Sequence, residues 1–309
     1  MKEKIKTFFA VCILILAVPY IVTLLFQGDE TSPDSGKVQN FSKEKVSETL
    51  KMKDKDTDVE KYLVGVMAKE ISPDYHKEAL KAQAVIARTA LSAAGEDENN
   101  PLPESMSQEE MMKLWGRENF EKNYSILEEA AKDTKGEILV YQEKPAHGAF
   151  HAVSAGKTRS AKDALQTEEE PYLASVDSKM DIPSLDYLKV VFMEKEEFLE
   201  KLREICPELK AGKENILESV EIQSRDSADY AVKVKVGEKE ITGEEFRNSL
   251  GLNSACFYIK EVENKVRIVT KGLGHGLGLS QYGANELAKE GKNYKEILQY
   301  YYKEIQIKR

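Results

Sequence analysis

The sequence predicts an α+β fold in which one N-terminal membrane-spanning helix precedes an extracytoplasmic domain of mixed helices and strands. Two observations carry this prediction. Residues 8–26 contain no charged side chain, and helix-periodic and strand-periodic segments then follow without a regular βα alternation, which disfavours a doubly wound sheet. The chain has 309 residues, of which 41% are hydrophobic, enough for a sizeable core.

The N-terminal segment is expected to anchor the chain in a membrane. As a helix, residues 8–26 would span roughly 28 Å, about the thickness of a bilayer core. Lys2, Lys4 and Lys6 precede it, and such flanking charge stays in the cytoplasm. We therefore expect a cytoplasmic stub and anchor over 1–27. A cleavable signal peptide is the alternative, although no small-residue cleavage site follows the run.

A polar linker and one folded domain are expected to follow the anchor. Residues 28–56 are rich in Asp, Glu, Lys, Ser and Gly, a composition typical of a solvated linker. The folded domain should then occupy 57–309, outside the cytoplasm.

Two helices are expected to open this domain. Apolar residues at helical spacing predict a helix from Asp58 to about Ile71, where Ser72 and Pro73 end it. A second helix should begin at Asp74 and continue through an Ala-rich body. On that helix Lys81 and Arg88 are seven residues apart, so they fall about 20° from each other. A stripe of apolar side chains lies beside them, namely Leu80, Ala84, Ala87 and Leu91.

The remaining elements are predicted from shorter patterns. The polar stretch 95–123 should hold a loop and one surface helix, and a helix near 124–133 should precede a strand at 136–141. Residues 148–154 look like the partner of that strand across a turn at 142–145. Further strands are expected within 216–239, at 256–260 and at 265–269. Helices are expected at 241–250, from Ser280 onward, and at 293–302.

Charge and cysteine content exclude several classes of protein. Lys plus Arg is 45 and Asp plus Glu is 54, so the net charge is 45 − 54 = −9, which disfavours nucleic acid as a partner. The three cysteines, Cys12, Cys206 and Cys256, are too few for a disulfide framework. A single bridge between Cys206 and Cys256 stays open.

The glycine-rich segment 271–284 is the most unusual in the chain. It contains no G-x-G-x-x-G, no phosphate-loop Lys and no G-x-S-x-G, so dinucleotide, nucleotide and nucleophile-elbow motifs are excluded. Gly274 and Gly276 allow close backbone approach around His275. A helix beginning at Ser280, Gln281 and Tyr282 would present donors to a ligand. The alternative is a glycine-rich turn around a structural histidine.

A second polar cluster follows the strand near residue 150. It consists of His151, Ser154, Lys157 and Thr158, side chains that suit sugar hydroxyls. No metal or other cofactor is expected. His147 and His151 face the same side of a strand, so zinc near His151 is an alternative, but no Cys or acidic third ligand stands beside them.

Several segments resemble one known family in sequence and in order. They are EKYLVGVMAKEISPDYHKEALKAQAVIARTA, FHAVSAGKT, EEFRNSLGL, GLGHGLGLSQYGANELAKEG and ILQYYY. Together they are similar to the stage II sporulation protein D family, sporulation lytic transglycosylases that share their domain with amidase-enhancer proteins. The resemblance covers about residues 57–309.

The resemblance implies a reaction on peptidoglycan during engulfment of the spore. It implies cleavage between N-acetylmuramic acid and N-acetylglucosamine of denuded glycan strands, which leaves 1,6-anhydro ends. It also implies a partner amidase, other membrane engulfment proteins as partners, and a location in the mother-cell membrane facing the forespore. The family's acid/base is the Glu before Ile71, which is Glu70.

The residues themselves are compatible with that role for Glu70. It lies in the last turn of a helix, where partial burial and the negative end of the helix dipole both raise the pKa of a carboxyl group. A solvated helix-end carboxylate is the alternative. Lys81 and Arg88 would hold substrate oxygens, or else form ion pairs with Glu70 or Glu78.

Three positions depart from the family pattern. Ala152 and Ala155 replace residues of a segment richer in Ser and Gly, and Ala90 stands where an aromatic residue is common. Less stacking surface puts substrate affinity in question rather than the type of reaction. A non-catalytic enhancer that binds glycan or the amidase is the alternative function.

Overall fold

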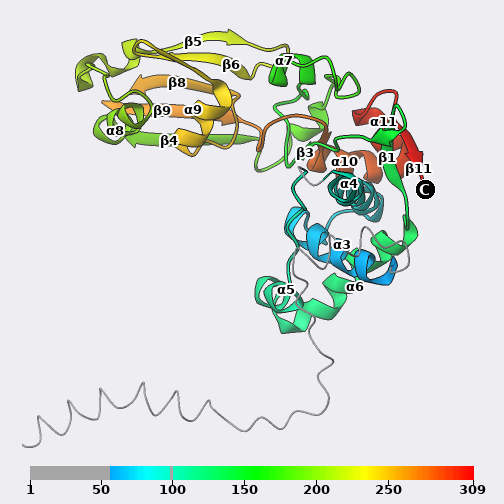
Figure 1. Cartoon of the computed structure of the whole chain (residues 1–309). Helices are drawn as coiled ribbons and strands as arrows, with labels where there is room; N and C mark the ends of the chain where they lie inside the picture. The colour runs from blue at the N-terminus through cyan, green and yellow to red at the C-terminus, as the bar shows by residue number, and fades with distance from the viewer. Residues whose placement is uncertain (1–55, 98–99) are drawn as a thin grey trace, which may run out of the picture. The chain divides into compact units, whose positions relative to one another are not determined.

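The computed structural model describes residues 56–97 and 100–309. The expected anchor and nearly all of the expected linker lie outside these residues. Within the described ranges no helix combines the length and apolar character needed to cross a membrane. Helices and strands are mixed along the described chain, as the sequence predicts (Figure 1).

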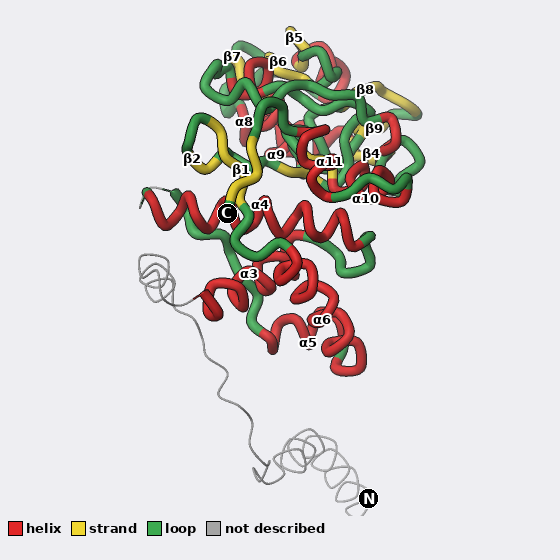
Figure 2. The backbone as a smooth tube through the Cα atoms, turned by 90° about the vertical axis from the view of Figure 1, so that its right-hand side faces the viewer, coloured by secondary structure: helices red, strands yellow, loops and turns green. Residues whose placement is uncertain are grey.

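Four helices come first and share one core. They are α3 (Asp56–Glu70), α4 (Lys77–Glu96), α5 (Gln108–Trp115) and α6 (Arg117–Asp133). The expected apolar stripe of α4 is buried in this core beside Leu63, Met67 and Leu127. Figure 2 shows α3, α5 and α6 gathered on one side of α4.

The second helix begins later than the sequence suggests. Asp74 does not start it, because residues 72–75 form a turn in which the Tyr75 amide donates to the Ser72 carbonyl (3.3 Å). The cap is His76, whose ring Nδ1 accepts from the Glu78 amide (3.3 Å). A histidine is not a common N-cap, so local preference pointed to the aspartate instead.

The strand after α6 has different partners from those expected. β1 (Ile138–Tyr141) pairs with β2 (Lys144–Pro145) across a tight turn, and on its other side with β11 (Gln306–Lys308) near the C-terminus. Residues 148–154 are not its partner. There β3 (Phe150–His151) pairs in parallel with β10 (Leu279–Ser280) instead. The early turn at 142–143 leaves residues 148–154 free to meet the glycine-rich segment.

A second core lies among strands and two helices in the middle of the sequence. The sheet order β4-β9-β8 and the order β5-β6-β7 are both antiparallel. The sequence did not predict β4, α8 or β7. The elements are β4 (Leu188–Glu194), α8 (Lys195–Ile205), β5 (Val220–Arg225), β6 (Ala231–Val236), β7 (Lys239–Thr242), α9 (Gly243–Leu250), β8 (Phe257–Val262) and β9 (Lys265–Lys271).

The last two helices complete a third core with α4 and β1. α10 (Gln281–Lys289) and α11 (Tyr294–Tyr301) both pack against α4. Leu287 of α10 and Leu298 and Tyr301 of α11 are buried in this core. The short helix α7 (Ala161–Leu165) and the 3-10 helix η1 (Lys179–Asp181) pack against this third core, and the 3-10 helix η2 (Lys213–Ser219) contributes Ile216 to the second core.

The two described cysteines are not bonded to each other. Cys206 and Cys256 are both free and buried. Cys206 belongs to the core around α8, whereas Cys256 packs with Tyr230 and Ala255. The bridge that the sequence left open is therefore absent from the structure.

Candidate active site

Glu70 ends α3 and is held by side chains from two other helices. Its side chain is half-buried. Gln83 of α4 donates from Nε2 to the Glu70 carboxylate Oε2 at 2.8 Å. Gln281, the first residue of α10, donates from Nε2 to the Glu70 backbone carbonyl at 2.8 Å. That carbonyl is one of the orphan acceptors at a helix end, so Gln281 closes α3 while fixing Glu70.

The two glutamines also contact each other. Gln281 Nε2 lies 3.3 Å from Gln83 Oε1, and both side chains are buried. The consecutive helices α3 and α4 and the distant helix α10 therefore converge on one residue, Glu70. Sequence analysis did not find Gln83. Its signal was a single amide inside the Ala-rich buried face of α4.

Burial sets the protonation of Glu70. It raises the pKa of the carboxyl from 4.5 to about 7, and the hydrogen bond from Gln83 opposes the rise. A neighbouring carboxylate is not among the causes. At neutral pH the protonated and ionised forms are both populated, as a group that first gives and then takes a proton requires.

This raised pKa predicts a pH-dependent cost in stability. Between pH 4.5 and 7 the unfolded carboxyl ionises while the folded one stays protonated, so stability falls as pH rises through this window. We expect Glu70→Gln to raise the free energy of unfolding by about 2–3 kcal/mol at pH 8 and by little at pH 4. Urea unfolding at both pH values measures the difference.

A suitable control is Glu121→Gln, because Glu121 is exposed on α6. This change should leave the stability of the chain nearly the same at pH 4 and pH 8. Equal stability of the Glu70→Gln variant and the unchanged chain at pH 8 would contradict a buried, proton-retaining carboxyl.

The start of α10 joins Glu70 to the segment around His151. The Ser280 hydroxyl caps α10 by accepting from the Gly283 amide at 3.2 Å. Ser280 is also the β10 residue opposite His151 of β3, and the Tyr282 amide donates to the Ala152 carbonyl at 3.0 Å. The strand pair β3–β10 thus ends at His151 and Ser280. Gln281, the next residue after Ser280, reaches the Glu70 carbonyl.

The two histidines at this place are both neutral. His151 Nδ1 lies 2.9 Å from the Leu277 carbonyl, so Nδ1 carries the proton. Burial, with the charge of His275 as a second cause, lowers the pKa of His151 to about 3. Burial lowers the pKa of His275 to about 4. Nε2 of His151 has no hydrogen-bond partner among the described residues, and in this tautomer it can only accept.

The backbone of the glycine segment lies closer to its neighbours than a residue with a side chain would allow. Gly274 and Gly276 have positive φ of 112° and 82°. A Cβ at Gly274 would lie 2.7 Å from the His151 Cβ, and one at Gly276 would lie 2.6 Å from the Tyr230 ring. The segment therefore needs glycine at both positions, and it places His275 5.8 Å from His151 between ring centroids.

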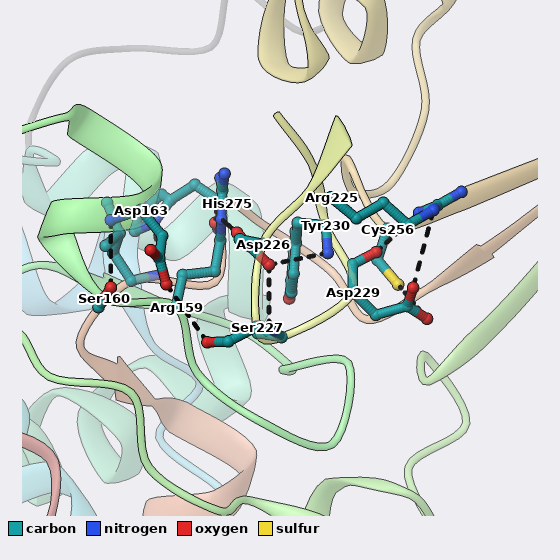
Figure 3. A network of polar contacts seen from close by, with 12 residues as sticks. Arg159, Ser160, Asp163, Arg225, Asp226, Ser227, Asp229, Tyr230, Cys256 and His275 are labelled. Atoms are coloured by element: carbon teal, nitrogen blue, oxygen red, sulfur yellow. Dashed lines mark hydrogen bonds and ion pairs between the residues drawn. The ribbon is translucent and has the colours of Figure 1, made fainter. Parts of the chain in front are cut away.

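A buried ion-pair network holds the glycine segment from the other side (Figure 3). Arg159 Nε lies 2.6 Å from Asp226 Oδ2, and its Nη1 lies 3.0 Å from Glu244 Oε1. Nη1 also donates to the His275 carbonyl at 3.3 Å, and the Arg159 amide donates to the Gly276 carbonyl at 2.8 Å. Sequence analysis did not find Arg159 or Asp226.

Ser154 and Thr158 are buried and hold the backbone in place. The Ser154 amide donates to Asp181 Oδ2 at 2.7 Å, and the Ser154 hydroxyl accepts from the Gly156 amide. The Thr158 hydroxyl accepts from the Val176 amide at 2.9 Å. Lys157 is half-buried, and its Nζ lies 3.4 Å from the Ser227 carbonyl.

Lys81 and Arg88 lie on the other side of α4 from Gln83. At 100° per residue they fall about 160° and 140° from it around the helix. Lys81 pairs with Glu78 (3.1 Å) and Asp133 (2.8 Å). The Lys81 ammonium is thus bound by carboxylates of the protein itself. Because Glu78 is one of the two, this agrees with the ion-pair alternative for Lys81.

The buried guanidinium of Arg88 has four acceptors. It pairs with Glu60 at 2.9 Å. It also donates to the Thr134 hydroxyl and to the carbonyls of Ala131 and Glu137. Neither Glu70 nor Glu78 is its ion-pair partner, so Arg88 ties α3, α4 and α6 together.

The two histidines considered for zinc have separate partners. His147 Nδ1 lies 3.0 Å from Glu170, and His151 Nδ1 meets the Leu277 carbonyl. Within residues 56–97 and 100–309, no group of three or more His, Cys, Asp or Glu side chains is arranged to hold a metal ion.

Comparison with known proteins places this arrangement in a family. A family model described as "Stage II sporulation protein" matches residues 48–141, which include Glu70 and Gln83. The chain is 32% identical to "Stage II sporulation protein D" of Bacillus subtilis (strain 168), over 99% of this chain and 96% of that protein. The protein of the same name from Bacillus amyloliquefaciens gives the same figures.

A more distant relative carries a different name. The chain is 26% identical to the "Amidase enhancer" of Bacillus subtilis (strain 168), over 78% of this chain and 39% of that protein. The match to the two stage II sporulation proteins spans nearly the full length of both partners and exceeds 30% identity. The chain therefore belongs to the stage II sporulation protein D family.

Proposed function

We propose that the protein is a membrane-anchored lytic transglycosylase that cleaves peptidoglycan during sporulation, with Glu70 as its single acid/base. Family membership supports a role in sporulation, and the similarity to an amidase enhancer supports a role at the cell wall. The observation that carries the chemistry is the pKa of about 7 of a carboxyl held by Gln83 and Gln281.

One carboxyl group can perform the whole reaction. Protonated Glu70 gives its proton to the glycosidic oxygen, and the bond from that oxygen to C1 of N-acetylmuramic acid breaks. The 6-hydroxyl of the same sugar then bonds to C1, and its proton returns to Glu70. Hydrolases of glycosidic bonds use a second carboxylate as nucleophile or base. The causes of the Glu70 pKa shift include no such neighbour.

Residues next to Glu70 have roles that follow from their contacts. Gln83 orients the carboxylate and favours its ionised form, which aids return of the proton. Gln281 holds the end of α3 so that Glu70 keeps its position. His151 is buried, its unprotonated Nε2 included, so a sugar hydroxyl reaches this acceptor only if the strand pair of His151 and Ser280 opens. Denuded glycan strands are the proposed substrate.

The products distinguish this reaction from hydrolysis. We expect the full chain, purified in mild detergent, to convert peptide-free glycan strands into fragments with 1,6-anhydro-muramic ends. Mass spectrometry detects these as fragments one water molecule lighter than hydrolysis products. Fragments with ordinary reducing ends, labelled with oxygen from heavy-oxygen water, would overturn the proposal in favour of hydrolysis.

A second candidate function is a non-catalytic enhancer of a partner cell-wall amidase. The similarity to the "Amidase enhancer" of Bacillus subtilis favours it. If the chain yields no glycan fragments but raises peptide release by a purified amidase from intact wall, and Glu70→Gln does so equally well, this candidate replaces the first.

A further inference from the structure

The outer face of the β4-β9-β8 sheet carries an exposed row of apolar side chains. Leu188, Val190 and Phe192 alternate along β4 and are 54%, 38% and 57% exposed. Met193, which points to the opposite face of the same strand, is buried with α8 in the second core. Large apolar side chains gathered on one exposed face mark an interaction site more often than chance.

The neighbouring strands extend this face. The register sets Val269 of β9 opposite Val190, and Tyr258 of β8 opposite Val269. Tyr258 is 36% exposed. Figure 1 shows α8 and α9 beside these strands, and both helices pack into the core on the inner face. On the outer face Arg225 and Lys271 lie over the Tyr258 ring, whereas the apolar row on β4 is exposed.

Positive charge accompanies the apolar row. Arg267 lies opposite Phe192, and Lys260 lies opposite Arg267. Two further cations on this face are matched within the described chain, since Lys271 approaches Asp229 and Lys265 pairs with Glu194. A face with excess cations on a chain of net charge −9 is complementary to an acidic partner.

The strand at the margin of this face is also an unprotected edge. β4 stands at the end of the order β4-β9-β8 and pairs with β9 over seven consecutive residues without a bulge. Proteins usually blunt such edges with charged side chains, proline, bulges or short strands. β4 carries Lys189 and Glu194, but it has no proline and no bulge. Among the described residues β9 is its one strand partner, so its outward backbone N–H and C=O groups face the position of an added strand.

We propose that β4 and the outer face of its sheet bind an extended, acidic and apolar segment of a partner protein as an added strand. Apolar side chains on one face of the segment would contact the row on β4, and carboxylates on that same face would meet Arg267, which lies beside Phe192 on the next strand. A bilayer cannot pair with the free backbone edge. A second copy of β4 would bring only one carboxylate to this face, Glu194, and that carboxylate already pairs with Lys265.

One end of the docking face adjoins the start of the glycine segment. The Gly272 amide donates to the Tyr187 carbonyl at 2.7 Å, directly before β4. Leu188 pairs with Lys271, the residue that opens the glycine segment. A partner bound along β4 would therefore reach the Lys271 end of this segment. This proposal goes beyond glycan cleavage and does not require Glu70.

A labelled synthetic peptide tests the chemistry of the partner. The probe is a nine-residue peptide in which Val and Glu follow each other at every second position, so that both point to one face of the strand, and Thr fills the other positions. Its match has Lys in place of Glu. By fluorescence anisotropy with the full chain in mild detergent, we expect the Glu peptide to bind at least tenfold more tightly than the Lys peptide. Added salt should weaken it.

Two variants and one control locate the binding. The double variant Val190→Ser, Phe192→Ser should weaken binding of the Glu peptide at least tenfold, because burying either apolar side chain under the peptide should contribute more than a factor of ten to the affinity. Arg267→Glu should reduce or reverse the difference in affinity between the Glu peptide and the Lys peptide. Leu114→Ser is the matched control, because Leu114 is 59% exposed on α5, and it should bind like the unchanged chain.

Three results would overturn the proposal. One is equal binding of the two peptides, or binding that ignores the serine variants. Another is protection of β4 from hydrogen exchange by anionic vesicles without any peptide, which would assign the face to a membrane. The third is dimerisation that the serine changes abolish, which would assign it to a second copy.

The test also separates this proposal from the proposed function. The serine variants should still cleave glycan at the unchanged rate, because neither residue contacts Glu70 or its glutamines. Conversely, Glu70→Gln should bind the Glu peptide normally. Loss of cleavage and loss of peptide binding are thus independent outcomes.

Discussion

Replacing Glu70 by Gln should lower the rate of glycan cleavage by about 10²–10⁴-fold, the usual contribution of one general acid/base. Gln has nearly the same shape and can still accept the Gln83 hydrogen bond, but it has no proton to give at neutral pH. The rate of 1,6-anhydro product formation, followed by liquid chromatography of peptide-free glycan strands, measures the loss.

The pH profile of the unchanged chain gives an independent check on this assignment. With a pKa of about 7, Glu70 loses its proton as pH rises through 7, so cleavage should decline above that value. Glu121→Gln serves as the control, since Glu121 is exposed on α6, and should cleave normally. A Glu70→Gln variant that keeps more than a tenth of the rate would mean that another group delivers the proton.

Replacing Arg159 by Met should lower the free energy of unfolding by about 3–5 kcal/mol. The Arg159 side chain is 3% exposed and that of Asp226 is 1% exposed, so the change leaves a buried carboxylate without its cation. The free energy of unfolding in urea measures this loss. Hydrogen exchange at residues 274–277 should quicken as well, because the His275 carbonyl loses a donor.

A double-variant cycle isolates the pair. Arg159→Met combined with Asp226→Asn removes both charges, so it should be less destabilised than the sum of the single changes by at least about 1 kcal/mol. The exposed pair Lys265–Glu194 is the control, and Lys265→Met should cost less than about 1 kcal/mol. Additive effects in the buried pair would show that Arg159 and Asp226 do not depend on each other.

Local patterns were sufficient for much of the fold. The helical period located α3, the body of α4 and α11, because these helices bury one face and their polar residues face outward. Alternation located β5, β6, β8 and β9 for the corresponding reason. The pattern did not predict β4, because five of the seven residues in LKVVFME are apolar and they face both sides of the strand, so polar and apolar residues do not alternate.

The pairing predicted for residues 148–154 was wrong because it followed the order of segments along the chain. A hairpin with 136–141 is the shortest connection, yet β3 pairs with β10, more than a hundred residues away. The glycines at 274–278 make this pairing feasible, because a Cβ at Gly278 would lie 1.9 Å from the Ala149 carbonyl oxygen. Such a close backbone approach depends on two distant segments, and neither one signals it alone.

The sequence by itself determined the family, the candidate acid/base Glu70, and the segments that meet around it, since these are properties of residue type and order. Only the tertiary structure decided which side chains support that carboxyl. Gln83 and Gln281 reach Glu70, whereas Arg88 turns to Glu60. The pKa of Glu70 is a property of this assembly, because burial, which raises it, exists only after α3, α4 and α10 have packed together.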